Sequence, residues 1–281
     1  MYDIKPFPIP VVADLGPGTQ FEDDALDYIA MPQGMATYHT PALPEPEDIA
    51  QRVGAVQVLH EVLAALRQVA EGAAPKLDTA RVSLANLAAK DLTLINQVLG
   101  EGEVSAQVLA RSGTPVLQIQ ESVFAGVWRV IESQSDGTLR DWIEVGGIPA
   151  VLRQTAKLDA SQTVPTGMPV PPDVMNAPSV LVELEDQRST WQPGQLAHVV
   201  NLSLLPLTPM DIGYLDYRLG TGRVLILSRG YGNCRITNCC VPHTWRVVYY
   251  NSQDTVILNS VEVTDMPEVA CAAPEDLVDS V

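Results

Sequence analysis

The sequence has 281 residues, enough for one large or two medium domains that bury their own hydrophobic cores. Its 34 acidic and 17 basic side chains give a net charge of -17, which repels nucleic acid and anionic membrane surfaces and favours basic partners. No apolar run approaches the roughly 18 residues of a membrane span. The first residues also lack the pattern of a signal peptide, so we expect a cytoplasmic protein.

Residues 1–44 are predicted to form an extended arm, because seven prolines and a cluster of acidic side chains oppose both helix and sheet. The first repeat, residues 45–158, then opens with a helix between Glu45 and Gly72. Apolar side chains recur there at intervals of three and four residues, at Val53, Val56, Leu59, Leu63, Leu66 and Val69. This spacing predicts one buried helix face.

A shorter helix is predicted from Asp91 to Leu99. Four segments with β character follow it: "EVSAQVL", "PVLQIQES", "FAGVWRVIE" and "RDWIEV". Turn signals such as Asp136-Gly137 separate these segments and suit tight hairpins. A helix followed by consecutive hairpins predicts an α+β fold.

A proline-rich linker, residues 159–178, is predicted to lead into a second repeat, residues 179–281. "DLTLINQVLGEGEV" aligns with "DIGYLDYRLGTGRV" 120 residues later, and "VWRV" aligns with "TWRV" 117 residues later. Thr208 is predicted to cap the helix of the second repeat, with Asp211 near the positive end of its dipole. We therefore expect an internal duplication in which each repeat packs a helix on an antiparallel sheet, with an approximate twofold axis between the repeats.

In both repeats the aligned helix ends in Leu-Gly-x-Gly. Gly100 and Gly220 are predicted to be C-terminal caps with a left-handed backbone. Gly102 and Gly222 are predicted to lie in the turn into the next strand. The glycines are therefore interpreted as structural.

The other residues of this turn differ between the repeats, since Thr221 and Arg223 replace Glu101 and Glu103. The fold therefore does not require carboxylates at these positions. Two interpretations stay open: a solvated face, or a contact or cation site that belongs to the first repeat alone. A phosphate loop is disfavoured, because the glycines follow a helix and carboxylates repel phosphate.

The segment "NCRITNCCVPH" holds the one cluster in the sequence that resembles a metal site, formed by Cys234, Cys239, Cys240 and His243. Its spacing matches neither a zinc ribbon nor a ferredoxin run. Two interpretations stay open: buried structural thiols, or ligands of zinc or an iron–sulfur cluster. Otherwise we expect no cofactor.

Catalytic motifs are missing from the sequence, which has no nucleophile elbow, P-loop or zinc-protease signature. Trp128 and Trp245, each followed by an arginine, are interpreted as core anchors rather than as a ligand platform. We therefore predict that the protein is not an enzyme. An enzyme of an unrecognised type would need a deep polar pocket between the repeats.

Several long strings resemble the HupH/HoxQ/HyaF family of hydrogenase expression/formation proteins. They are "GPGTQ", "MPQGMATYHTPALPE", "LGEGEVS", "SRGYGNCRITNC", "YYNSQDTVILNSVEV" and "AAPEDLVDS". This resemblance runs from the arm to the last residues. It implies an accessory protein for the maturation of uptake [NiFe] hydrogenase that acts on the iron–sulfur small subunit precursor before export, beside a thioredoxin-like accessory protein.

Two hypotheses follow for the residues that carry this function. In the first, an assembly chaperone contacts its client through Gly100, Glu101, Gly102, Glu103, Arg229, Tyr231, Asn233 and Arg235. In the second, an iron–sulfur or metal carrier uses Cys234, Cys239 and Cys240. The acidic charge favours the first hypothesis, because it would steer the protein to basic client surfaces.

Overall fold

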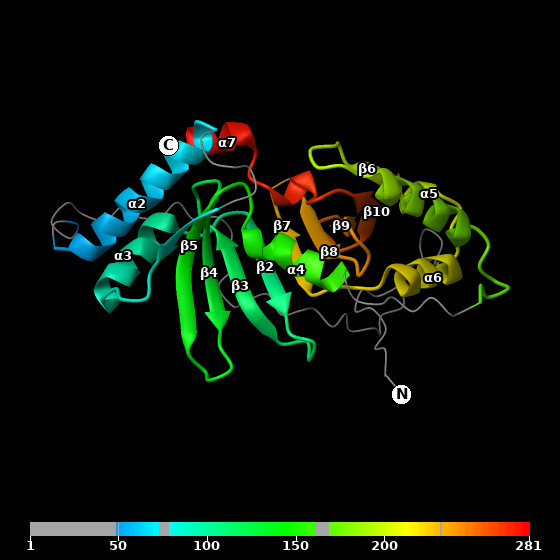
Figure 1. Cartoon of the computed structure of the whole chain (residues 1–281), viewed down its shortest axis with the longest axis horizontal. Helices are drawn as coiled ribbons and strands as arrows, with labels where there is room; N and C mark the ends of the chain where they lie inside the picture. The colour runs from blue at the N-terminus through cyan, green and yellow to red at the C-terminus, as the bar shows by residue number, and fades with distance from the viewer. Residues whose placement is uncertain (1–48, 50, 73–78, 161–168, 231) are drawn as a thin grey trace.

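The structure is a computed structural model, and it describes residues 49, 51–72, 79–160, 169–230 and 232–281 (Figure 1). The predicted N-terminal arm, residues 1–44, lies outside the described residues. The elements in chain order are α2 (Val53–Ala70), β1 (Ala80–Ser83), α3 (Ala89–Leu99), β2 (Val104–Leu109), β3 (Pro115–Glu121), β4 (Val127–Ser133), β5 (Leu139–Val145), α4 (Ala150–Ala160), α5 (Ala177–Thr190), β6 (His198–Asn201), η1 (Leu202–Leu204), α6 (Pro209–Leu219), β7 (Val224–Ser228), β8 (Asn233–Asn238), β9 (Thr244–Tyr250), β10 (Val256–Val263), η2 (Glu268–Ala270) and α7 (Pro274–Asp279).

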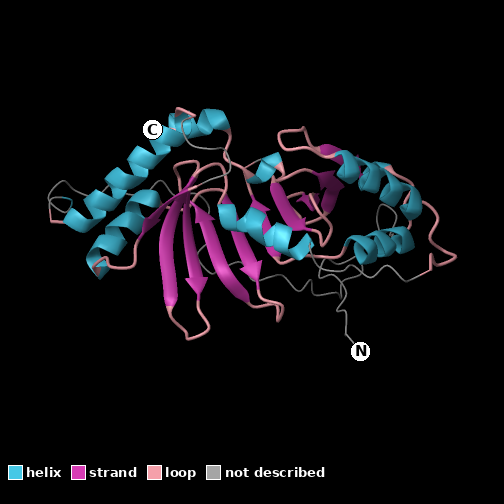
Figure 2. Cartoon of the chain, in the orientation of Figure 1, coloured by secondary structure: helices cyan, strands magenta, loops and turns pink. Residues whose placement is uncertain are grey.

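The ten strands of the described chain form one sheet in the order β1-β5-β4-β3-β2-β7-β8-β9-β10-β6 (Figure 2). Every neighbouring pair is antiparallel, which confirms the predicted α+β class and antiparallel pairing. The repeats do not have separate sheets, however, because β2 of the first repeat pairs with β7 of the second. This pairing satisfies backbone groups that would otherwise lie on two exposed edges.

An approximate twofold axis passes through the middle of the β2–β7 pair. Ala106 pairs with Ile226, and these two residues hold equivalent positions in the two repeats. Paired residues on neighbouring strands point to the same face of a sheet. The axis is therefore perpendicular to the sheet, and equivalent helices of the two repeats cover the same face.

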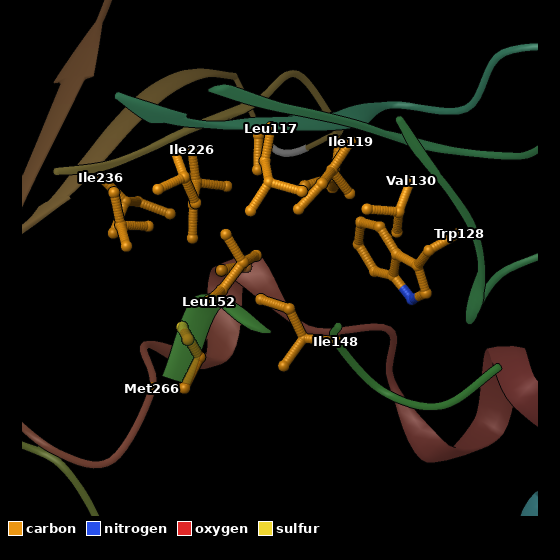
Figure 3. Close-up of a cluster of buried hydrophobic side chains, with 14 of the residues drawn as sticks. Leu117, Ile119, Trp128, Val130, Ile148, Leu152, Ile226, Ile236 and Met266 are labelled. Carbon is orange, nitrogen blue, oxygen red and sulfur yellow. The ribbon is translucent and has the colours of Figure 1, made fainter. Parts of the chain in front are cut away.

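The burial pattern shows the two helical layers. On one face, α2, α3 and α7 pack on the first half of the sheet, while α5 and α6 pack on the second half. On the opposite face, α4 and η2 cover the centre of the sheet (Figure 1). Figure 3 shows Ile148, Leu152 and Met266 facing the apolar side chains of the sheet across this central core.

Helix α2 occurs where a helix was predicted, but its buried face differs from the predicted one. The buried side chains are those of Ala55, Val58, Val62, Ala65 and Leu66, whereas Val53 is 75% exposed. The buried stripe is therefore centred about one residue earlier than the apolar spacing indicated. Small alanines face the core because α3 and α7 both approach α2 closely.

Other segments also depart from the sequence-based expectation. The helices α4 and α5 were not predicted, and their ends, Asp159 to Ala160 and Ala177 to Pro178, overlap the predicted linker. The middle of that linker, residues 161–168, lies outside the described residues. The edge strands β1 and β6 were missed because each has only four residues.

The start of α6 is built as predicted and also holds a second helix in place. The Thr208 hydroxyl accepts a hydrogen bond from the Asp211 N–H (3.1 Å), and the Asp211 carboxylate accepts one from the Thr208 N–H (2.9 Å). Asp211 also accepts the N–H of Ala177 at the start of α5 (2.9 Å). Burial alone would raise the pKa of Asp211, but the N–H donors of Ala177 and Thr208 outweigh burial and hold it well below its usual range.

Candidate functional site

The Leu-Gly-x-Gly turn of the first repeat joins α3 to β2 at the centre of the sheet. Gly100 has a φ of 56°, and its N–H donates to the Asn96 carbonyl (3.0 Å). The N–H of Gly102 donates to the Glu121 carbonyl (2.7 Å). A Cβ at Gly102 would lie 2.2 Å from the carbonyl oxygen of Ser122, so only glycine fits. Both glycines are structural, as predicted.

The second repeat builds the same turn from its own residues. Gly220 has a φ of 64°, and the N–H of Gly222 donates to the Asn238 carbonyl (2.8 Å). One detail of the prediction is wrong: the ψ angles of Gly100 and Gly220 are -161° and 169°, so neither residue is left-handed helical. The extended ψ directs the chain into the strand, which a left-handed helical residue would not do.

The first turn presents its acidic side chains to solvent. Glu101 and Glu103 are both exposed, and the Glu103 carbonyl accepts the N–H of Arg229 (3.1 Å) from the end of β7. The Glu103 carboxylate lies over Gly230, where an added Cβ would come within 2.1 Å of it. The structure therefore brings two of the predicted contact segments side by side.

The remaining predicted contact residues lie farther along the second segment. Asn233 is exposed at the start of β8, and Arg235 is half-buried two residues later. No hydrogen bond or ion pair in the described ranges joins Asn233 or Arg235 to Glu101 or Glu103. Tyr231 lies outside the described residues.

Glu121 also belongs to this turn, and the sequence did not single it out. Its side chain is 7% exposed, and its carboxylate accepts the N–H of Gly126 (3.2 Å). Burial raises its pKa to about 7, and the nearby carboxylates of Glu103 and Asp276 add to this rise, while the Gly126 N–H opposes it. The repeat alignment held one signal for this residue, since the equivalent position in the second repeat is an amide, Asn238.

The equivalent turn of the second repeat has the opposite electrostatics. Asp159, at the end of α4, is buried and accepts hydrogen bonds from the Arg223 backbone N–H (2.7 Å), the Arg223 side chain (2.7 Å) and the Asn238 amide (3.0 Å). The Asn238 amide oxygen also accepts the N–H of Val224 (2.9 Å). A carboxylate, a guanidinium and an amide thus satisfy one another here, whereas the first turn gathers carboxylates.

The cysteine cluster does not converge on one point. Cys234 is buried in the central core, whereas Cys239 is buried in the core under α5 and α6. Burial raises the pKa of both thiols to about 12, and it also raises the pKa of Cys240. A metal ligand must be a thiolate, which burial disfavours. In the ranges that the structure describes, no three His, Cys, Asp or Glu side chains are placed to hold a metal ion.

Trp128 and Trp245 are core anchors, as predicted. Both indoles are buried in the central core, and the Trp128 Nε1–H donates to the Gly146 carbonyl (2.9 Å). The arginine after each tryptophan points to the other face of the sheet: Arg129 pairs with Asp141 (2.6 Å), and Arg246 pairs with Asp216 (3.3 Å). These arginines stabilise helix-covered parts of the sheet. None of the helices in the described ranges is long and apolar enough to span a bilayer.

Comparison with known proteins identifies the family. The sequence profile described as "HupH hydrogenase expression protein, C-terminal conserved region" matches residues 52–164 and again residues 174–281. The chain belongs to the HupH family. Its two matches contain α2 to α4 and α5 to α7, so each copy of the HupH conserved region supplies half of the continuous sheet.

Curated relatives agree with this assignment. The chain is 56% identical over 274 residues to "Hydrogenase expression/formation protein HoxQ" of Cupriavidus necator, covering 98% of this chain and 94% of that protein. It is 45% identical to "Hydrogenase expression/formation protein HupH" of Rhodobacter capsulatus, covering 99% and 95%. It is 33% identical to "Hydrogenase-1 operon protein HyaF" of Escherichia coli, covering 95% and 91%. These HupH-family relatives are therefore similar over nearly their whole length.

Proposed function

We propose that this chain is an accessory protein of hydrogenase maturation that binds an immature hydrogenase subunit. Its family and the printed names of its full-length relatives support this role. The client is the iron–sulfur small subunit precursor of an uptake [NiFe] hydrogenase, held in the cytoplasm before export. A thioredoxin-like accessory protein works beside it.

The observation that carries the proposed contact site is the difference between the two turns. In the second turn, Asp159 and Arg223 neutralise each other within the fold. In the first turn, Glu101 and Glu103 are exposed on an equally rigid backbone, and the only cation that adjoins them in the described sequence neighbourhood is Arg229 at the end of β7. Exposed carboxylates on a rigid turn suit recognition of a basic client surface.

The contact surface comprises the turn and the segment beside it. Its proposed members are Gly100, Glu101, Gly102 and Glu103, together with Arg229, Tyr231, Asn233 and Arg235. The glycines shape the backbone, and the charged and amide side chains make the contacts. A chaperone acts through its higher affinity for the immature client than for the mature one and needs no reaction centre.

The test is co-purification of the tagged chain from cells that express the whole hydrogenase operon. The variant Glu101→Thr/Glu103→Arg gives the first turn the sequence of the second, so the backbone is already known to accept it. We expect the small subunit precursor to co-purify with the wild type and to be lost or strongly depleted with this variant. High salt is expected to weaken the wild-type complex, because exposed charges are screened.

A matched control removes two exposed acidic side chains elsewhere. Glu71→Ala/Asp186→Ala changes the ends of α2 and α5 and leaves the turn intact. This control is expected to retain the client. Normal maturation with the turn variant, or equal loss with the control, contradicts the contact surface. Failure of the wild type to retain any hydrogenase subunit contradicts the proposed function itself.

A further inference from the structure

A cavity of about 240 Å³ opens between the end of α4 and the turn from β8 to β9. Helix α4 comes from the first repeat and the turn from the second, so the cavity lies between the two repeats. Its polar and aromatic lining consists of Arg153, Lys157, Cys239, His243, Trp245 and Asp265. The client contact surface proposed above contributes no residue to this lining.

The first repeat has the same place in its fold, and there the chain fills it. Gly126 and His243 are equivalent: both have a positive φ, 77° and 53°, and each accepts a backbone N–H at 2.8 Å from the segment after the last strand of its repeat, Gly146 and Thr264. Leu277 of α7 packs directly on Gly126, where an added Cβ would lie 2.1 Å from its Cδ2 atom. Helix α7 thus occupies in the first repeat the place that is open in the second.

The second repeat has side chains suited to binding at this place. His243 keeps the positive φ that its glycine counterpart adopts freely, a conformation that is uncommon and strained for other residues. Its imidazole stacks on the indole of Trp191, with ring centroids 3.7 Å apart and planes at 16°. A turn needed only for the fold would be built more easily with glycine, as the first repeat shows.

The charge of the cavity also differs from that of the filled site. Arg153 pairs with Asp265 (2.8 Å), and Lys157 is exposed with no ion-pair partner in the described ranges. The positions equivalent to Arg153 and Lys157 in the first repeat are Cys271 and Glu275. In a chain of net charge -17, the open site therefore has a net positive wall.

Catalysis by the Cys239, His243 and Asp265 side chains is not supported. Burial raises the pKa of the Cys239 thiol to about 12, the reverse of the lowered pKa of a nucleophilic cysteine. No hydrogen bond between Cys239 and His243 is present in the described part of the chain. The cavity is therefore suited to binding rather than to chemistry.

We propose that this cavity binds a short helical segment of a partner protein, which inserts a leucine-sized side chain and places a carboxylate beside Lys157. The segment does in the second repeat what α7 does in the first, where Leu277 is flanked by Asp276 and Glu275. The chain's own α7 is unavailable, because Leu277 is 8% exposed in the core under α2. The occupant must therefore come from another molecule.

The test uses the full chain and a labelled, N-acetylated synthetic peptide with the sequence of residues 272–281, which carries the required leucine and carboxylates. Saturable binding is expected by fluorescence anisotropy, together with a change in the ring resonances of His243. Lys157→Glu, which copies the first repeat, is expected to weaken binding by about tenfold through the loss of one charge pair. Ala156→Phe fills the cavity and is expected to abolish binding.

Controls separate the possible outcomes. A peptide with aspartate in place of its leucine is expected not to bind, and thermal unfolding shows that both protein variants are folded. No saturable binding up to about 1 mM, a free energy below about 4 kcal/mol, overturns the proposal. Binding that is indifferent to Lys157→Glu and Ala156→Phe, or dimerisation of the chain through α7, also overturns it. Glu101→Thr/Glu103→Arg is expected to bind the peptide normally, so this result is independent of the client surface.

Discussion

The two central turns share one backbone and differ in how their side chains are satisfied. Both donate the N–H of the second glycine to the end of the neighbouring strand, at 2.7 Å from Gly102 and 2.8 Å from Gly222. In the second turn, buried Asp159 collects three hydrogen bonds from Arg223 and Asn238. In the first turn, carboxylates adjoin one another. Duplication thus conserved the backbone contacts, and the side chains became structural in one copy and exposed in the other.

The largest expected effect comes from removing the acid of the second turn. Asp159→Ala leaves the Arg223 guanidinium and the buried Asn238 amide without their acceptor. Breaking a buried pair in this way destabilises a protein by about 3–5 kcal/mol. We expect a loss of stability of that size in urea unfolding followed by circular dichroism.

The first turn supplies the matched control for this prediction. Asp276 is the nearest counterpart of Asp159 in the repeat alignment, and it is exposed. Asp276→Ala is expected to change stability by less than about 0.5 kcal/mol, as is usual for surface positions. Equal effects of the two substitutions would show that the electrostatic difference between the turns is not real.

The next largest effect tests the backbone that the turns share. Gly102→Ala places a Cβ 2.2 Å from the Ser122 carbonyl, and a backbone atom cannot move away cheaply. We expect a loss of about 2–3 kcal/mol in the same unfolding assay, which is typical of overpacking in a well-packed region.

A nearby glycine gives the contrast. A Cβ at Gly230 would meet the flexible, exposed carboxylate of Glu103, which can swing into solvent. Gly230→Ala is therefore expected to be nearly neutral. A similar loss at both glycines would mean that the clash with Ser122 does not limit the first turn.

A smaller effect, of opposite sign, is expected at Glu121. Its pKa is raised from 4.5 to about 7 in the folded protein, chiefly by burial. Between these values the unfolded chain loses its proton first, so the stability of the wild type falls as the pH rises through about 7. Glu121→Gln is neutral, like Asn238 in the second repeat, and lacks this dependence.

The variant should therefore gain on the wild type as the pH rises. We expect Glu121→Gln to be more stable than the wild type by roughly 2 kcal/mol at pH 8, with little difference at pH 5. Unfolding measured at both pH values checks this. A constant difference across this range would show that Glu121 does not titrate there.

The sequence predicted those features that depend on local pattern. The alternation in "EVSAQVL" and "RDWIEV" gave β2 and β5, and the Thr208 cap was found because a hydroxyl, a proline and an acid stand at fixed offsets. The glycines of the turns were interpreted correctly because two copies could be compared. In α5, by contrast, apolar side chains are spread around the helix, so no stripe indicated it.

Features that depend on distant contacts were not predictable in this way. The β2–β7 pairing joins segments 120 residues apart, and nothing local requires it. Glu121 lies 18 residues from Glu103, and only the folded β2–β3 hairpin brings them together. The cavity beside His243 was likewise invisible, because its counterpart, Gly126, is covered by the distant Leu277.

The smallest expected effect on stability is also the most informative one about function. Glu101→Thr/Glu103→Arg copies the second turn into the first, and both positions are exposed, so the free energy of unfolding should change by less than about 0.5 kcal/mol. A slight gain is expected, since replacing Glu103 removes a negative charge near Glu121. An unfolding curve that coincides with that of the wild type, together with loss of the hydrogenase subunit in co-purification, would show that the first turn gave up internal pairing for recognition. A large loss of stability would instead place Glu101 and Glu103 among the residues that hold the fold together, as Arg223 is in the second turn.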